Sequence, residues 1–80
     1  MQDNQKYCKF NEGDYVQMYF RTAQGIWKAD HLRSPRYAEH DGKRARVIAR
    51  IALDNMCIYT LRVSADIELQ GIPEDCLIHL

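Results

Sequence analysis

The second half of the chain shows a regular alternation of apolar and polar residues, which is the pattern of β-strands with one buried face. Three such stretches cover residues 44–51, 58–63 and 66–70. In the first of them the apolar face is formed by Ala45, Val47, Ala49 and Ile51. An earlier run at residues 15–20 places Val16, Met18 and Phe20 on one face. We therefore predict a first strand at 15–20 and consecutive antiparallel strands after residue 44.

The turn between the first two alternating stretches raises a problem of register. Asp54-Asn55 favours a two-residue hairpin, but pairing Leu53 with Met56 would place Val47 opposite an arginine and bury mismatched faces. Pairing Leu53 with Cys57 instead aligns the apolar faces. We therefore expect an odd-length loop or a bulge at this turn.

Two other connections have their own signals. Residues 21–41 are mixed in character and broken by Gly25 and Pro35, which predicts a long loop or a split hairpin. Near the C-terminus, Pro73 interrupts strand pairing, so one tight turn is expected at Pro73–Cys76, followed by a short last strand.

The C-terminal segment Gly71-Ile-Pro-Glu-Asp-Cys-Leu77 resembles the end of an SH3 domain, where a glycine, an apolar residue and a proline precede a one-turn helix and the final strand. This resemblance implies an all-β fold, a small five-stranded SH3-like barrel with a long loop after the first strand. The barrel domain would cover residues 10–80, after a flexible N-terminal tail at residues 1–9. Cys76 stands where peptide-binding SH3 domains carry a tyrosine, and Trp27 has no neighbouring tryptophan. The resemblance therefore implies the barrel more than the aromatic peptide groove.

Composition narrows the classes of function. Eleven basic residues balance eleven acidic ones, so no overall field attracts nucleic acid or an acidic membrane. No apolar stretch approaches the roughly 20 residues of a membrane span, and the first residues lack the apolar run of a secretion signal, so we expect a cytoplasmic protein. The three cysteines are odd in number and widely separated, and we expect them to be reduced thiols. A core this small is marginal on its own, and a homodimer would bury more surface, so a homodimer is also considered.

The sequence shows no catalytic or metal-binding motif. His31, His40 and His79 lie far apart, and no pair of histidines or cysteines has the short spacing of a zinc site. We therefore expect no enzyme activity, no cofactor and no metal. Glu39-His40-Asp41 is interpreted as a solvated turn ahead of the strand at 44–51.

A second resemblance runs from Phe10 to Val63 and is similar to the SH3-like domain of the nitrile hydratase β subunit. It rests on four segments: Phe10 with Gly13-Asp-Tyr-Val16, His31-Leu-Arg-Ser-Pro-Arg-Tyr37, Gly42 leading into the Val47 strand, and Tyr59-Thr-Leu-Arg-Val63. The resemblance implies an accessory subunit that packs on a metal-holding α subunit, with Arg33 and Arg36 as the matching arginines. Glu39-His40-Asp41 departs from the basic residue that the family carries before this glycine. The chain also lacks the α subunit's cysteine cluster.

These observations support a non-enzymatic binding module that contacts another protein, or a second copy of itself, through the 21–41 loop. The candidate contact residues are Trp27, His31, Arg33, Arg36 and Tyr37. One alternative is a small nucleic-acid-binding barrel, with basic side chains gathered on one strand face near aromatics. Its candidate residues are Lys43, Arg44, Arg46 and Arg50. The other alternative is the accessory subunit of a nitrile-hydratase-like enzyme.

Overall fold

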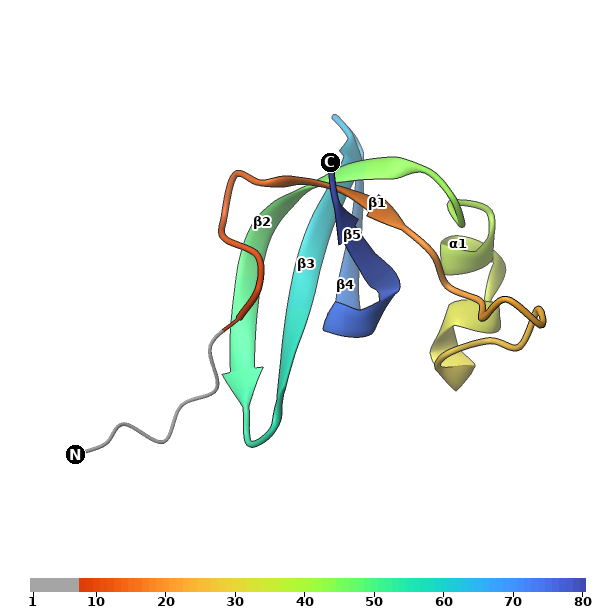
Figure 1. The fold of residues 1–80 in the computed structure, drawn as a ribbon. Helices are drawn as coiled ribbons and strands as arrows, with labels where there is room; N and C mark the ends of the chain where they lie inside the picture. The colour runs from red at the N-terminus through yellow and green to blue at the C-terminus, as the bar shows by residue number, and fades with distance from the viewer. Residues whose placement is uncertain (1–7) are drawn as a thin grey trace.

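A computed structural model describes residues 8–80 and shows an all-β domain (Figure 1). Its five strands form one antiparallel sheet in the order β4-β3-β2-β1-β5. The strands are β1 Tyr15–Met18, β2 Arg44–Leu53, β3 Met56–Ser64, β4 Ile67–Pro73 and β5 Leu77–His79. Three short helical turns complete the fold: η1 Asp30–Arg33, α1 Pro35–Ala38 and η2 Glu74–Cys76. The predicted all-β class, the long connection after the first strand and the tight turn before the last strand are confirmed.

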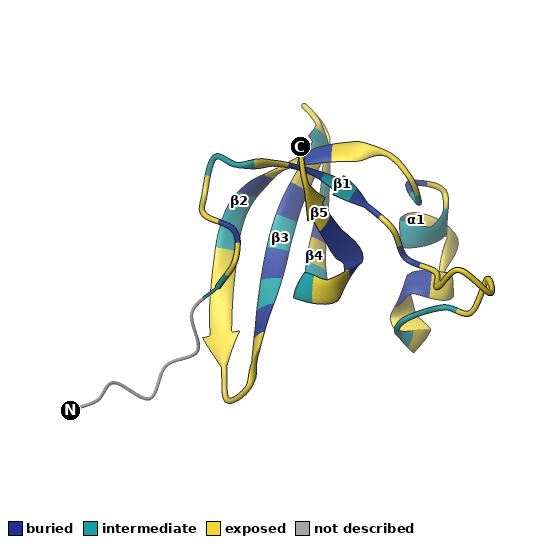
Figure 2. Cartoon of the chain, in the orientation of Figure 1, coloured by how far each residue is buried: buried dark blue, intermediate teal, exposed yellow. Residues whose placement is uncertain are grey.

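The core is built from the apolar faces that the alternation marks. Val16 and Met18 of β1 are fully buried, as are Tyr59 and Leu61 of β3. Leu69 and Ile72 of β4 complete the same layer, and Phe20 and Leu32 enter it from the long connection. Figure 2 shows buried segments at the start of β2 and along β3, and an exposed far end of β2.

The prediction for the β2–β3 turn is wrong. Leu53 pairs directly with Met56 across the two-residue turn Asp54-Asn55, and the irregularity lies upstream, between Val47 and Ala49. A bulge at Ile48 absorbs one residue, so Val47 pairs with Leu61 while the turn stays tight. The mismatch of faces was correctly recognised in the sequence, but a bulge anywhere along the hairpin can relieve it.

The bulge reverses the faces of the second half of β2. Ala45 and Val47 are buried as predicted, but Ile51 is exposed because it pairs with Ile58 on the outer side of the sheet. Ala49 is only partly buried. Arg50 instead pairs with the buried Tyr59, which puts its side chain on the inner face. A shift of one residue moves every following side chain to the opposite face.

The expectation of reduced cysteines is wrong for two of the three. Cys8 forms a disulfide with Cys57 of β3, 49 positions away, while Cys76 is free and buried. The fold brings the two Cα atoms to 5.7 Å, a separation that a disulfide spans readily. The backbone N–H of Lys9 also donates to Glu74 Oε2 at 2.7 Å. The anchored part of the chain therefore begins no later than Cys8, and the rest of the predicted tail, residues 1–7, lies outside the described residues.

Candidate functional site

The 21–41 connection runs along the free edge of β4 and binds its backbone. His31 Nε2 lies 2.9 Å from the carbonyl oxygen of Gly71. Arg36 Nη2 donates to the carbonyl of Glu68 at 3.2 Å, and the Tyr37 hydroxyl donates to the carbonyl of Gln70 at 3.0 Å. The buried Leu32 anchors this segment in the core. The connection therefore covers a sheet edge that would otherwise present unpaired carbonyls.

This arrangement divides the predicted partner-binding residues. His31, Arg36 and Tyr37 are engaged with the chain's own β4 edge, and the His31 and Tyr37 rings meet edge to face with centroids 5.2 Å apart. Arg33 is exposed, with only a 3.7 Å contact to Asp30. Of the two arginines that the nitrile hydratase resemblance singles out, Arg36 is thus used internally and Arg33 points to solvent.

Trp27 is held half-buried at the outer end of the same connection. It packs against the core, and the Arg21 guanidinium lies over its ring at 5.1 Å. Arg21 is itself fixed by a 3.0 Å ion pair with Asp41, whose other carboxylate oxygen accepts the backbone N–H of Phe20 at 2.7 Å. The neighbouring Ile26 is 64% exposed. Trp27 therefore presents a rigid aromatic edge beside a bare apolar side chain.

A groove opens where three separate segments meet, and one of its lining residues, Lys28, directly follows Trp27 in the chain. Lys28 and Ala29 come from the long connection, residues 55–57 from the β2–β3 turn, and residues 73–75 from the end of β4 and η2. Lys28 Nζ donates to the carbonyl of Asp75 at 2.7 Å and so ties two of the three segments together. We call this feature the loop–hairpin groove. Its lining residues are Lys28, Ala29, Asn55, Met56, Cys57, Pro73, Glu74 and Asp75.

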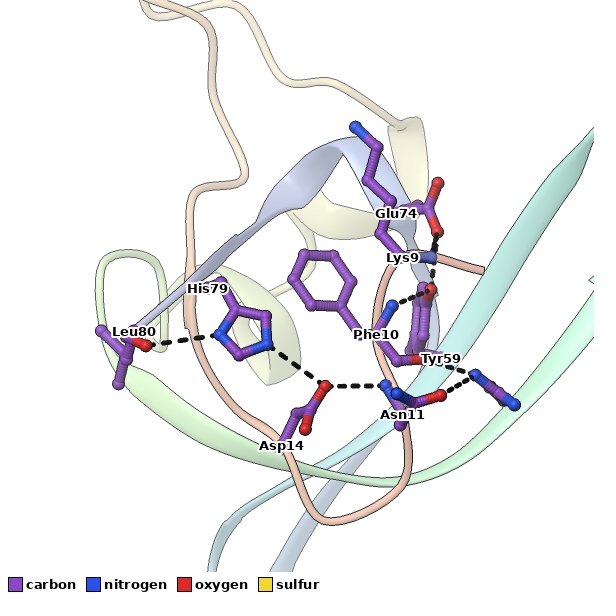
Figure 3. A network of polar contacts seen from close by, with 9 residues as sticks. Lys9, Phe10, Asn11, Asp14, Tyr59, Glu74, His79 and Leu80 are labelled. Atoms are coloured by element: carbon purple, nitrogen blue, oxygen red, sulfur yellow. Dashed lines mark hydrogen bonds and ion pairs between the residues drawn. The ribbon is translucent and has the colours of Figure 1, made fainter. Parts of the chain in front are cut away.

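One wall of the groove is fixed by hydrogen bonds, shown in Figure 3. Glu74 Oε2 accepts the Tyr59 hydroxyl at 2.6 Å as well as the N–H of Lys9. The Tyr59 oxygen in turn accepts the N–H of Phe10 at 3.2 Å. Burial, with the Glu74 carboxylate as a second cause, raises the pKa of Tyr59 to about 12. The phenol therefore stays protonated and keeps its bond to Glu74 at neutral pH.

The N-terminal arm, residues 8–14, is fixed to the sheet by a second set of contacts in the same view (Figure 3). Arg50 Nη1 donates to the carbonyl of Phe10 at 2.8 Å and to Asn11 Oδ1 at 2.6 Å. Asp14 Oδ2 accepts the N–H of Asn11 at 2.8 Å and lies 3.3 Å from His79 Nε2. The Asn11 N–H is the main cause of the lowered pKa of Asp14. The carboxylate thus remains charged and holds the arm's turn.

The predicted basic cluster is not one surface. Arg44 and Arg46 are exposed on the outer face of β2, where the Arg46 guanidinium lies 5.7 Å from the centre of the Tyr15 ring. Lys43 is exposed beside them. Arg50 lies on the inner face because of the bulge at Ile48, and its guanidinium binds the N-terminal arm. The prediction that Arg50 shares a face with Arg44 and Arg46 is therefore wrong.

His40 is buried, so its interpretation as part of a solvated turn is also wrong. Its side chain is 5% exposed, Nε2 lies 3.4 Å from Glu39 Oε2, and Nδ1 has no partner among the described residues. The neighbouring Asp41 explains the burial, because its two hydrogen bonds to residues 20 and 21 pull this turn against the core. In the described part of the chain, no group of three or more His, Cys, Asp or Glu side chains could hold a metal ion.

Sequence reasoning singled out Trp27, which directly precedes the groove residue Lys28, but missed the groove itself. Met56, 45% exposed, and Pro73 lie 28 and 45 positions from Lys28 and line the same groove only through the fold. The available signal was modest: an apolar residue directly after a tight turn is a candidate for exposure, and Pro73 marked the η2 turn.

Comparisons of this chain with models of protein families, with curated proteins and with solved structures find no match. Within residues 8–80, no helix has the length and apolar character to cross a membrane.

Proposed function

We propose that this domain is a non-enzymatic binding module that holds an extended segment of another protein in the loop–hairpin groove, beside Trp27. The observation that carries the proposal is the meeting of three separate segments around a groove whose lining includes the exposed side chain of Met56. A rigid aromatic residue next to exposed apolar side chains is typical of the centre of a protein interface.

The chemistry of the groove favours a partner segment with apolar side chains and free backbone groups. Ala29, Met56 and Pro73 provide an apolar floor, while the Lys28 ammonium has further donors besides its bond to Asp75. The wall at Glu74 is fixed by Tyr59, so this side of the groove is preorganised. Preorganisation lowers the entropy lost on binding.

Two other functions receive less support. Without Arg50, the nucleic-acid alternative rests on Lys43, Arg44 and Arg46, with Tyr15 available for stacking. The accessory-subunit alternative keeps Arg33 as its exposed arginine, because Arg36 is engaged with β4. Both remain proposals of lower rank.

The test begins with the wild-type domain as bait for a displayed library of random peptides. Selected segments are titrated while the fluorescence of Trp27, the single tryptophan of the chain, is recorded, and backbone amide shifts locate the bound segment. We expect shifts at residues 28–29, 55–57 and 73–75. Met56→Asp should weaken binding by roughly tenfold or more, because it puts a charge against an apolar contact.

Ile67→Asp is the matched control, since Ile67 is an exposed apolar residue at the β3–β4 turn and does not line the groove. It should leave the affinity unchanged. Failure to select any segment, or shifts confined to other surfaces, would overturn the proposal. Salt-dependent RNA or DNA binding that Arg44→Glu and Arg46→Glu abolish would support the nucleic-acid alternative instead.

A further inference from the structure

The far half of β2 has an edge with no strand partner in the described chain. β1 pairs with β2 only at Arg44–Arg46. The N-terminal arm then adds two backbone bonds at Val47, where Gly13 N–H donates to its carbonyl at 2.7 Å and its own N–H donates to the carbonyl of Asp14 at 2.9 Å. Residues 50–53 pair with β3 alone. Unpaired amide and carbonyl groups on such an edge are a template for another strand.

This edge keeps only one of the usual protections against pairing, the inward-pointing charge of Arg50. Natural edge strands carry lysine, proline or inward-pointing charges, or are covered by another segment. Here Ile51 is 59% and Leu53 is 47% exposed, and both lie on the outer face of the hairpin. The one charged side chain, that of Arg50, turns to the inner face and binds the carbonyl of Phe10. Figure 2 shows this end of β2 as a continuous exposed strip.

We propose that residues 50–53 form a homodimer interface, at which β2 of a second copy of this chain adds antiparallel to β2. A twofold register centred on Ala52 sets Ile51 opposite Leu53 of the second copy and Arg50 opposite Asp54 of the second copy. Each match occurs twice by symmetry. The segment is thus complementary to itself in both apolarity and charge, as an isologous interface requires.

The backbone directions agree with this register. Because Leu53 and Met56 flank a two-residue turn, they form the closing bonded pair of the hairpin, and bonded and non-bonded pairs alternate along the ladder. Arg50 and Ala52 therefore direct their amide and carbonyl groups to the free edge. Centring on Ala52 brings these outward groups face to face across the two copies. The interface adjoins the loop–hairpin groove, because Leu53 pairs with Met56, but it shares no residue with it, and the variants below lie outside the groove, so the two proposals can fail separately.

Sedimentation equilibrium over a concentration series tests the interface. Wild type should show a monomer–dimer equilibrium. Ile51→Lys should weaken the dimer roughly tenfold or more, because the symmetric dimer contains the change twice. Ala52→Pro, which removes one outward N–H, should do the same. Ile78→Lys is the matched control: Ile78 is 56% exposed, on β5 rather than β2, and its substitution should leave the dimer intact.

A second pair of variants tests the charge match. Asp54→Lys should weaken the dimer and Asp66→Lys, at the β3–β4 turn, should not. Far-UV circular dichroism checks each fold, and the surface variants keep the test decisive if Ala52→Pro does not fold. A monomeric wild type at every concentration would overturn the proposal. So would a dimer that Ile51→Lys leaves intact or that Ile78→Lys disrupts.

Discussion

The outer edge of β4 and the edge of the far half of β2 differ in whether another segment of the chain covers them. The carbonyls of β4 are bound by His31, Arg36 and Tyr37 from the long connection. Residues 50–53 of β2 have no such cover among the described residues. The comparison teaches that polar and aromatic residues in a long loop can serve the fold itself. The edge without a strand partner among the described residues lies instead where β2 extends beyond β1.

The largest effect is expected from the disulfide that holds the N-terminal arm, the segment that covers the β2 edge at Val47. Reduction of the Cys8–Cys57 disulfide releases a constraint on a segment of 49 positions, and chain entropy gives a loss of about 4 kcal/mol in the free energy of unfolding. Urea denaturation with and without a dithiol reductant measures it.

A Cys8→Ser variant provides the control for the disulfide. Its unfolding midpoint should match that of reduced wild type and should not respond to the reductant. Equal midpoints for oxidised and reduced wild type would contradict the prediction.

The next-largest effect is expected from truncating Leu32, which anchors the 21–41 connection beside the edge of β4. Leu32 is fully buried, so Leu32→Ala should lower the free energy of unfolding by about 2–5 kcal/mol through lost apolar contact and a cavity. Hydrogen exchange should also accelerate more at the amides of residues 28–40, which belong to this connection, than at the amides of the strands. Equal acceleration in the connection and in all strands would show that the connection does not open independently of the sheet.

The smallest effect is expected from the loss of one hydrogen bond between the 21–41 connection and β4. Tyr37→Phe removes the hydroxyl that donates to the carbonyl of Gln70 and should lower the free energy of unfolding by about 1 kcal/mol. Tyr19→Phe removes a hydroxyl from an exposed tyrosine that directly follows β1 and should change this free energy little. Equal effects of the two substitutions would mean that the Tyr37 bond does not stabilise the β4 edge.

The sequence by itself determined the features that depend on local pattern. The alternation predicted where the strands of the second half lie, because every second side chain of a strand points to the same face of the sheet. Gly71 to Leu77 predicted the turn at η2, and the absence of either period in residues 21–41 predicted the long connection. Trp27 was also recognisable, since a lone aromatic residue in such a segment is either a cap on the core or part of a surface.

Only the tertiary structure decided how these parts face one another. The bulge at Ile48 put Arg50 on the inner face of the sheet and Ile51 on the outer face, because a single added residue reverses every later face and many positions can absorb it. The disulfide and the groove both join residues tens of positions apart, which no local pattern records. His31, Arg36 and Tyr37 acquired their role from the β4 edge beside them. The sequence specifies which residues are polar or apolar, whereas their partners follow from how the chain closes on itself.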